Sequence, residues 1–214
     1  MNPFPIILSA PSGGGKTAIG QRLRAIRPDI GYSVSCTTRR PRAGEVDGRD
    51  YYFLSTIEFE GARERGEFAE SAEVHGKLYG TLRREVERVL ASGRHVLMDI
   101  DVQGAAQFRK VFPRSVLVFV LPPSTDVLIA RLRARKTENA AQLALRLESA
   151  VLELGAAPEY EYVLVNDELD RAVNSLSAII DAESVRRDRM ERLDGRIAEL
   201  TRELRREIDS QQGS

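Results

Sequence analysis

The chain has 214 residues, 42% of them hydrophobic and 30% charged, and its 32 basic residues are balanced by 32 acidic ones. This length predicts a single domain with a sizeable core, and the balanced charge excludes a strong field for nucleic acid or a membrane surface. Cys36 is the single cysteine, which excludes an internal disulfide and a cysteine-based zinc cluster. With no visible signal peptide and no apolar run of membrane-spanning length, we expect a cytoplasmic protein.

A short apolar strand is predicted over Ile6–Ser9, and a helix over Thr17–Ile26. Between them lies "APSGGGKT", which fits G-x-x-x-x-G-K-[ST] with Ala10 in place of the first glycine. Glycines in such a turn let backbone N–H groups and a helix N-terminus point at one anion. We therefore predict a nucleotide-phosphate site in which Lys16 reaches the transferring phosphate and Thr17 holds Mg²⁺. The alternative is a chance match in a glycine-rich turn.

Further along, strand-like and helix-like stretches alternate. The predicted strands are His95–Ile100, Ser115–Leu121 and Tyr162–Asn166; the predicted helices are Gln103–Val111, Thr125–Arg133, Ala140–Leu154 and a segment from Glu168 onward. Short apolar strands separated by helices indicate an α/β fold with a parallel sheet covered on both faces. Two segments interrupt the alternation, from about residue 33 to 92 and from about 124 to 156.

The first of these segments begins "YSVSCTTRRPRAGEVDGRDYYF". Pro41 keeps the chain extended between Arg39 and Arg42. Two guanidinium groups with the Tyr51 and Tyr79 hydroxyls would clamp a dianionic phosphate, since Arg binds such groups in bidentate fashion. The alternative is a solvated basic loop in an arginine-rich chain. The whole stretch resembles the GMP-binding segment of guanylate kinases.

That resemblance continues in chain order through "EVHGKLYGT", "LMDIDVQGA", "LPPS" and "VLVNDELD" and covers about residues 5 to 185. It implies a P-loop kinase core formed by residues of about 1–32, 93–123 and 157–185. A GMP-binding lobe of about 33–92 and a helical lid of about 124–156 would be inserted into this core. A helical extension of about 186–214 would complete the single domain of residues 1–214.

The resemblance also implies an acceptor site for GMP. Its residues would be Ser35, Arg39, Arg42, Tyr51, Glu70, Tyr79, Thr81, Asp99 and Asp101. Guanine offers two neighbouring donors and the O6 acceptor, so Glu70 would accept from both donors while Ser35 and Thr81 donate to O6. For Glu70 the alternative is a surface carboxylate after a short helix. For Asp99 and Asp101, at the end of a strand, it is a helix N-cap.

On the donor side the resemblance implies ATP and Mg²⁺. The ATP-binding residues would be Ser12, Gly13, Gly14, Gly15, Lys16, Thr17, Ala18, Arg131, Arg135 and Asn166. Charge on the transferred group would be neutralised by Lys16, Arg39, Arg135 and Arg146, and Asp99 would join Thr17 at the metal through water. The sequence departs from the family at Lys136, where a glycine is usual, and at Ala18, where a small hydroxyl residue is common.

Together these features predict Mg²⁺-dependent transfer of a phosphoryl group from ATP to GMP, directly and without a covalent intermediate. Two alternatives are a related module that binds proteins without catalysis and a P-loop kinase for another phosphorylated acceptor. Cys36 is interpreted as a packing residue and His75 as a turn residue, neither with a catalytic role.

The tail carries apolar residues at coiled-coil spacing. They are Met190, Leu193, Ile197, Leu200 and Leu204, and Gly195 interrupts them. A helix of this length would be marginal in water, so the stripe should be buried. It would pack either on the chain's own core or on a second subunit, and we expect self-association.

Overall fold

The structure is a computed structural model that describes residues 2–74, 76–133 and 140–212. Its centre is a five-stranded sheet in the order β2-β7-β1-β8-β9, with every neighbouring pair parallel. The strands are β1 (Pro5–Ser9), β2 (Ile30–Gly31), β7 (His95–Asp99), β8 (Val116–Leu121) and β9 (Tyr162–Val165). The predicted α/β fold with a parallel sheet is confirmed. The two-residue strand β2 was not predicted, because it is too short to carry a periodic pattern.

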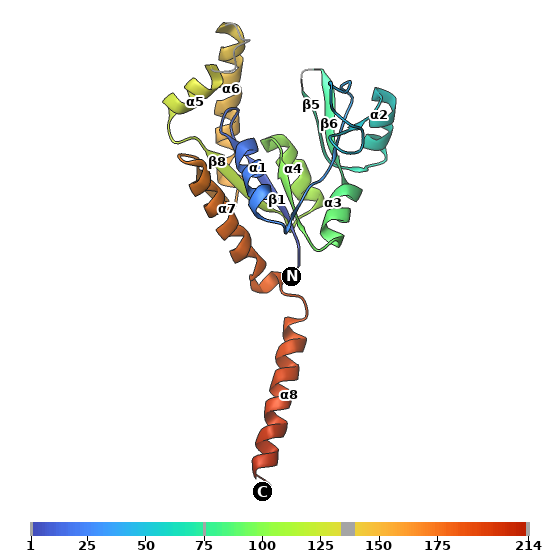
Figure 1. Ribbon diagram of the computed structural model, residues 1–214, viewed down its shortest axis with the longest axis vertical. Coiled ribbons are helices and arrows are strands. Elements are labelled where there is room, and N and C mark those ends of the chain that lie inside the picture. The colour runs from blue at the N-terminus through green and yellow to red at the C-terminus, as the bar shows by residue number, and fades with distance from the viewer. Residues whose placement is uncertain (1, 75, 134–139, 213–214) are drawn as a thin grey trace.

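Helices cover both faces of this sheet (Figure 1). Along β1 the side chains alternate, so Ile6 and Leu8 face one layer and Ile7 the other. The first layer holds α1 (Lys16–Ile26) and α7 (Leu169–Ser184), and the second holds α3 (Arg83–Ala91) and α4 (Val102–Val111). Burial on both faces explains why β1, β7 and β8 read as continuous apolar runs.

A second sheet, in the order β4-β3-β6-β5, lies to one side of the core (Figure 1). Its strands are β3 (Ser35–Thr37), β4 (Tyr52–Phe53), β5 (Phe68–Val74) and β6 (Lys77–Leu82), and α2 (Thr56–Glu64) packs beside it. Phe59 of α2 stacks on Phe68 with ring centroids 4.4 Å apart. Cys36 is fully buried here and burial raises the pKa of its thiol to about 12, so its predicted packing role is confirmed.

On the other side of the core stand α5 (Thr125–Arg133) and α6 (Ala140–Gly155), followed by the short helix η1 (Ala157–Glu159). Leu128, Leu132 and Ala150 form the small core between α5 and α6. The bounds predicted for α5 are confirmed, and those for α6 are right to within one residue at its C-terminal end. Arg135, Lys136 and His75 lie outside the described residues.

The tail begins with a turn that is tied to the core. After α7 come η2 (Arg187–Arg189) and the long helix α8 (Leu193–Gln212), which projects away from the body (Figure 1). Met190 precedes α8, so its predicted place in the helical stripe is wrong. Gly195 lies in the first turn of α8 and does not end the helix. In the described part of the chain, no helix combines the length and apolarity that crossing a bilayer requires.

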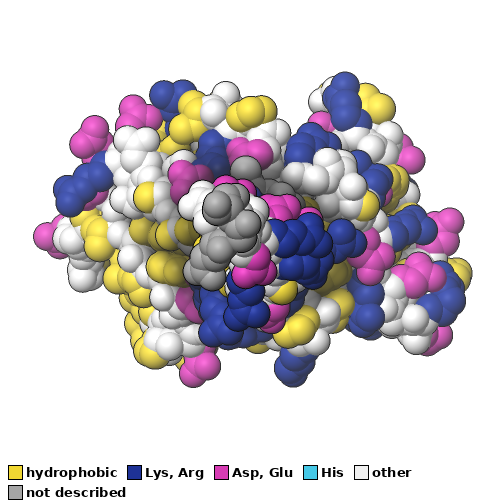
Figure 2. Space-filling model, turned by 90° about the horizontal axis from the view of Figure 1, so that it is seen from below, with side chains coloured by type: hydrophobic (Ala, Val, Ile, Leu, Met, Phe, Trp, Pro, Cys, Tyr) yellow, Lys and Arg dark blue, Asp and Glu magenta, His cyan; other side chains and the backbone are white. Residues whose placement is uncertain are grey.

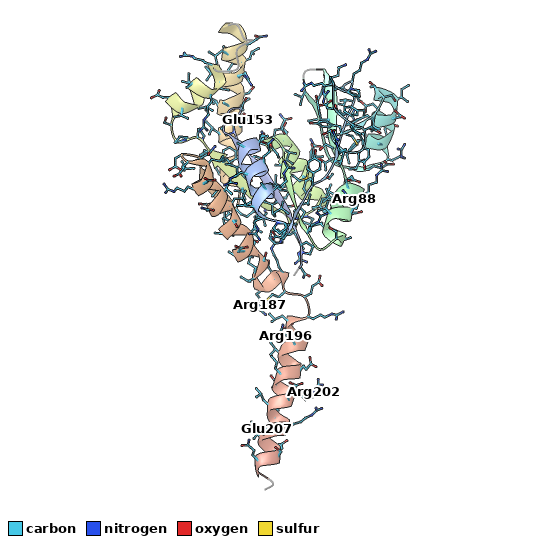
Figure 3. All side chains as sticks on the ribbon, viewed as in Figure 1. Arg88, Glu153, Arg187, Arg196, Arg202 and Glu207 are labelled. Carbon is cyan, nitrogen blue, oxygen red and sulfur yellow. The ribbon has the colours of Figure 1, made fainter. Side chains whose placement is uncertain are left out.

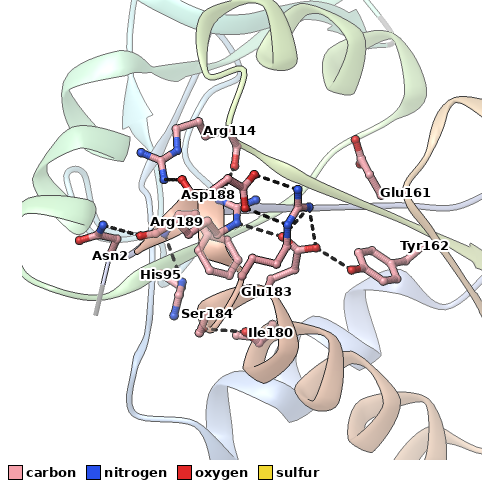
Figure 4. Close-up of polar contacts among 12 residues, drawn as sticks. Asn2, His95, Arg114, Glu161, Tyr162, Ile180, Glu183, Ser184, Asp188 and Arg189 are labelled. Carbon is pink, nitrogen blue, oxygen red and sulfur yellow. Dashed lines mark hydrogen bonds and ion pairs between the residues drawn. The ribbon is translucent and has the colours of Figure 1, made fainter. Parts of the chain in front are cut away.

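The tie is a buried polar network around Glu183 (Figure 4). The Glu183 carboxylate is 1% exposed and accepts from the Tyr162 hydroxyl at 2.6 Å, Arg189 Nε at 2.9 Å and Arg186 Nη1 at 3.1 Å. Burial alone would raise the pKa of Glu183, but these donors hold it below its ordinary value. Arg189 also stacks on the Phe4 ring, its guanidinium carbon 4.2 Å from the centroid. The segment between α7 and α8 is therefore fixed to the core.

Candidate active site

The glycine-rich loop leaves the carboxyl end of β1 and enters α1. Gly13 and Gly15 have φ angles of 85° and 93°, in the left-handed region that favours glycine. No side chain caps α1, so its first N–H groups remain for an anion. The loop lines a pocket of about 510 Å³ whose walls are Pro11, Ser12, Gly13, Gly14, Gly15, Lys16, Thr17, Ala18, Arg131 and Glu153. All of the predicted loop residues therefore meet at one cavity.

Two residues of the predicted ATP site form hydrogen bonds to the backbone of this loop. Asn166 is buried and its Nδ2 donates to the Gly14 carbonyl at 2.9 Å. A Cβ placed on Gly15 would collide with that amide, so the close approach also requires glycine. The Arg131 guanidinium donates to the carbonyls of Gly14 and Asn166, each at 3.4 Å. Asn166 thus holds the loop conformation, while Arg131 reaches the pocket wall.

Lys16 and Thr17 face a carboxylate on the neighbouring strand. Because β1 and β7 are parallel partners, Asp99 at the end of β7 lies beside the start of the loop. The Thr17 hydroxyl donates to Asp99 Oδ2 at 2.6 Å, and Lys16 Nζ lies 3.7 Å from Asp99 Oδ1. A hydroxyl and a carboxylate are oxygen ligands of the kind that Mg²⁺ prefers. Among the described residues, no group of three or more His, Cys, Asp or Glu side chains is placed to hold a metal.

Asp101 combines two roles. It is the N-cap of α4 and accepts from the Gly104 amide at 2.7 Å, as the N-cap alternative predicts. A Cβ on Gly104 would also lie 3.4 Å from Asp101 Oδ1 and 3.1 Å from Glu70 Oε2. The two carboxylates therefore border the same space, and Asp101 stands beside the predicted base site.

Ser35, Glu70 and Thr81 come from three adjacent strands of the second sheet. Ser35 and Glu70 are both register partners of Thr81, on β3 and β5 respectively. The Thr81 hydroxyl donates to Glu70 Oε1 at 2.7 Å. Glu70 is 8% exposed, so the alternative of a surface carboxylate is wrong. Burial raises the pKa of Glu70 to about 7, against the opposing hydrogen bond from Thr81, and the charge of Asp101 adds to the rise.

The predicted phosphate clamp has an acidic partner that the sequence reasoning missed. Arg39 makes a bidentate ion pair with Glu45, with both N–O distances 2.9 Å, and the Arg42 amide donates to Glu45 at 2.7 Å. The Arg39 guanidinium lies 5.5 Å from the Tyr51 ring centroid, and the Tyr51 and Tyr79 rings are 6.2 Å apart. The structure thus gathers Arg39, Tyr51 and Tyr79, while the Arg42 side chain is exposed.

Two of the described residues of α6 contact the loop. Glu153 accepts from the Ser12 amide at 2.8 Å, and Arg146 Nη2 lies 3.4 Å from Ser12 Oγ. Figure 3 shows Glu153 at the end of the core that carries the loop. Glu153 also borders a pocket of about 620 Å³ that Ser71, Glu73 and Asp101 line from the acceptor side. Nothing in the sequence pattern singles out Glu153, because it reads as an ordinary polar helix residue.

Comparison with known proteins adds an independent line of evidence. Residues 2–183 match the family model described as guanylate kinase. The guanylate kinase of Nitrosospira multiformis is 45% identical over 197 residues, which cover 92% of this chain and 94% of the relative. That of Symbiobacterium thermophilum is 49% identical over 181 residues, 85% and 86% of the two chains. The crystal structure of guanylate kinase from Anaplasma phagocytophilum superposes with a TM-score of 0.71 at 33% identity, covering 90% of this chain and 92% of that one.

Proposed function

Because this chain belongs to the guanylate kinase family, we infer that it is an ATP:GMP phosphotransferase, which converts ATP and GMP to ADP and GDP. One observation carries this conclusion for the chain itself. Lys16 of the loop lies beside Asp99, while the buried Glu70–Thr81 pair and Asp101 border the same space at Gly104, so the short segment from Asp99 to Asp101 links the two groups. A phosphate site and a base site thereby flank one strand end, where a phosphoryl group can pass between two nucleotides.

Base choice follows from the buried acceptor residues. An ionised Glu70 accepts from the guanine N1–H and the exocyclic amine, and the Ser35 and Thr81 hydroxyls donate to O6. Adenine presents an acceptor and a donor at the corresponding positions, so it would leave the buried carboxylate unpaired. Sites built from such polar groups reject a mismatched ligand strongly.

Arg39, Arg42, Tyr51 and Tyr79 are proposed to bind the phosphate of GMP. Glu45 is proposed as a positioning residue, because its bidentate pair with Arg39 fixes the guanidinium plane beside Tyr51. The contact from the Arg42 amide to the same carboxylate ties both arginines to one point. The clamp is then oriented before substrate arrives.

Thr17 and Asp99 are proposed as the protein side of the Mg²⁺ site, the metal taking most of its other ligands from ATP phosphates and water. When bound, the ion supplies positive charge to the phosphates of the donor. The loop amides orient the same phosphates, and Lys16 provides a fixed cation at the transferring end. Arg131 and Arg146, which already contact the loop region, are proposed to neutralise charge during transfer, together with Arg135.

Direct in-line transfer needs no protein nucleophile, because positioning and charge neutralisation account for most of the catalysis in this reaction class. Closure of the lid over the loop would exclude water and so protect ATP from hydrolysis. We propose a cytoplasmic setting, where ATP and GMP are available and a buried thiol such as Cys36 stays reduced. No role in nucleic-acid binding is proposed, given the balanced charge of the chain.

The test is ADP release in a coupled assay with GMP, AMP, CMP or UMP as the acceptor. We expect kcat/KM for GMP to exceed that for AMP by roughly 100-fold or more. Equal rates with AMP would favour a kinase for another acceptor. Tight GMP binding without ADP release would favour the non-catalytic module.

A further inference from the structure

The helix α8 bears an apolar stripe that faces solvent. Ile197, Leu200, Leu204 and Ile208 recur at intervals of three or four residues and are 51%, 51%, 66% and 53% exposed. Leu193 begins the same stripe one turn earlier. A single helix of this length is only marginally stable in water, so a partner for the stripe would stabilise it.

The chain's own core does not supply that partner. The residues just before α8 are held by the Glu183 network and by Asn2, whose Nδ2 donates to the Arg189 carbonyl at 2.6 Å. From this fixed point α8 runs away from the body (Figure 1). The alternative that the stripe packs on the core is therefore wrong for the described conformation.

The charge of α8 argues against a lipid surface as the partner. Four arginines and five acidic residues are distributed over Leu193–Gln212. Arg196, Arg202 and Glu207 all project from the helix into solvent (Figure 3). Helices that lie on membranes carry a polar face rich in Lys and Arg, which this helix lacks.

We propose that α8 pairs in antiparallel orientation with α8 of a second copy of this chain, forming a homodimer. In this register, Leu193 lies opposite the partner's Leu204, and Ile197 lies opposite the partner's Leu200. The two-fold symmetry repeats both contacts, so the seam has four apolar layers. The two bodies then lie at opposite ends of the helix pair.

The shape of the molecule selects this orientation. Packed helices lie about 8–10 Å apart. Seen along α8 from below, the body spreads to every side of the helix (Figure 2). Two parallel helices at that separation would force the two bodies into the same space, whereas antiparallel helices keep the bodies apart.

Charge complementarity also favours the antiparallel orientation. Arg196 and Glu203 lie on one flank of the stripe, and Asp194 and Thr201 lie on the other, where Ile208 forms the edge of the stripe. In an antiparallel pair, each flank faces the same flank of the partner helix. Arg196 therefore faces the partner's Glu203, and the two-fold symmetry produces this contact twice. In a parallel pair unlike flanks meet, and Arg196 and Glu203 would face the partner's Thr201 and Ile208 instead.

The molar mass of the full chain, measured by light scattering, tests whether the partner is a second copy of this chain. We expect twice the mass of one chain at micromolar concentration. Leu200→Glu should give the mass of one chain with unchanged kinase activity, because it puts a charge in the centre of the seam. Ala198→Glu introduces the same charge on the opposite face of α8 and should leave the dimer intact. A full chain that already has the mass of one chain overturns the proposal, as does binding to anionic vesicles in its place.

A deletion provides a second route to the monomer. The chain should be ended after Glu191 and not after Val185, because Arg186 and Arg189 satisfy the buried Glu183. We expect the chain ended after Glu191 to keep the Tm and activity of the monomeric variant. A dimeric deletion variant would overturn the assignment of the interface to α8.

Disulfide trapping tests the orientation. Leu193→Cys and Leu204→Cys are made separately, and the wild-type chain, whose Cys36 is buried, serves as the control. A disulfide requires Cα atoms within about 7 Å. In the antiparallel pair these two positions face each other, so cross-linked dimer should form in a mixture of the two variants and not in either alone. Rapid cross-linking within each single variant would indicate parallel helices and overturn the proposal.

A charge swap examines the same orientation without cysteine. Arg196→Glu should weaken association roughly tenfold, because it places like charges opposite each other twice. Adding Glu203→Arg should restore the dimer. If the double variant stays as weak as Arg196→Glu, the two residues do not face each other and the register is wrong.

Discussion

The proposed donor site and the proposed acceptor site are built from different parts of the chain's chemistry. The donor loop is built from backbone: two glycines with positive φ, an uncapped helix N-terminus, and a carbonyl held by Asn166. The acceptor region is built from side chains that already have partners, since Glu70 accepts from Thr81 and Arg39 pairs with Glu45. In the proposed sites, ATP would fill a loop that is already shaped, whereas GMP would exchange one set of hydrogen bonds for another.

This difference decides which changes each region tolerates. A backbone site is sensitive to what a side chain does to φ and ψ, and it is indifferent to most side-chain chemistry. A side-chain site is sensitive to proton state and to the loss of any partner. The predictions below separate the two kinds of dependence.

Lys16→Met is the side-chain change on the donor side from which we expect the largest effect. It removes the cation beside Asp99 and should lower kcat by roughly 10²–10³ while the fold survives. Steady-state kinetics with a melting curve on the same sample measure both quantities. Lys110→Met on the exposed side of α4 is the matched control. Near-normal turnover in a folded Lys16→Met variant would contradict the P-loop assignment.

Gly15→Ala tests the backbone character of the donor loop. Gly15 has a φ of 93°, and its new Cβ would collide with the Asn166 amide, so the loop must shift. As a result, kcat/KM for ATP should fall roughly 10- to 100-fold. Gly44→Ala is the control: its φ is 88° but no atom lies within 4 Å of the new Cβ. It should lower the free energy of unfolding by only about 1–2 kcal/mol. Unchanged kcat/KM for ATP in Gly15→Ala would contradict a role for the close contact with Asn166 in shaping the loop.

Glu70→Gln tests base recognition on the acceptor side. The variant loses the charge-assisted bonds and presents an amide donor to the guanine donors. The loss of transition-state stabilisation, calculated from kcat/KM for GMP at pH 8, should be about 1.5–3 kcal/mol. The kinetics are compared with those of Glu87→Gln, an exposed residue of α3. A variant that uses GMP as well as the wild type would show that the base is read elsewhere.

The pKa of about 7 for Glu70 adds a pH dependence. Since the proposed pairing of Glu70 with guanine requires the ionised carboxylate, KM for GMP should fall roughly tenfold from pH 6 to pH 8. The stability of the ligand-free protein should change in the opposite direction, falling as GMP binding improves. Between the ordinary pKa of a glutamate, 4.5, and the raised pKa of about 7, the folded chain binds more protons than the unfolded chain. The free energy of unfolding should therefore drop with rising pH in that window. Thermal melts should show this drop in the wild type and not in Glu70→Gln; identical slopes would contradict it.

Glu45→Gln should have the smallest effect. Arg39 keeps one hydrogen-bond acceptor but loses the bidentate ion pair, so KM for GMP should rise about 3- to 10-fold with little change in kcat. Glu64→Gln on the exposed end of α2 is the control, and Glu45→Ala should exceed Glu45→Gln. A fall in KM would show that Glu45 competes with the GMP phosphate for Arg39.

The sequence predicted the donor region and the central sheet well, because both depend on local patterns. Short apolar runs located four strands to within one residue, and the glycine motif located the loop. Glu45 was missed even though it lies six residues after Arg39, since only the folded turn shows that one carboxylate pairs with that guanidinium. Glu153 was missed because its contact with Ser12 spans 141 residues and leaves no local signal.

The tail shows the same limit in a different form. Its spacing predicted an apolar stripe, but the break between α7 and α8 depends on Arg189 reaching the buried Glu183 and the Arg114 carbonyl. No periodic pattern contains that information, so Met190 was assigned to the wrong side of the break. Which residues end a helix was here decided by tertiary contacts and not by propensity.

The bond between Asn166 and Gly14 has a consequence for how the molecule is made. It spans 152 residues, so the loop near the N-terminus is completed by a side chain from the last strand region of the core. Closing a loop has an entropic cost that rises with the number of residues it encloses. A nascent chain that has been synthesised only through β8 carries the whole glycine motif but lacks the amide that holds it. The loop therefore cannot gain its full set of contacts until the segment that carries Asn166 has been synthesised.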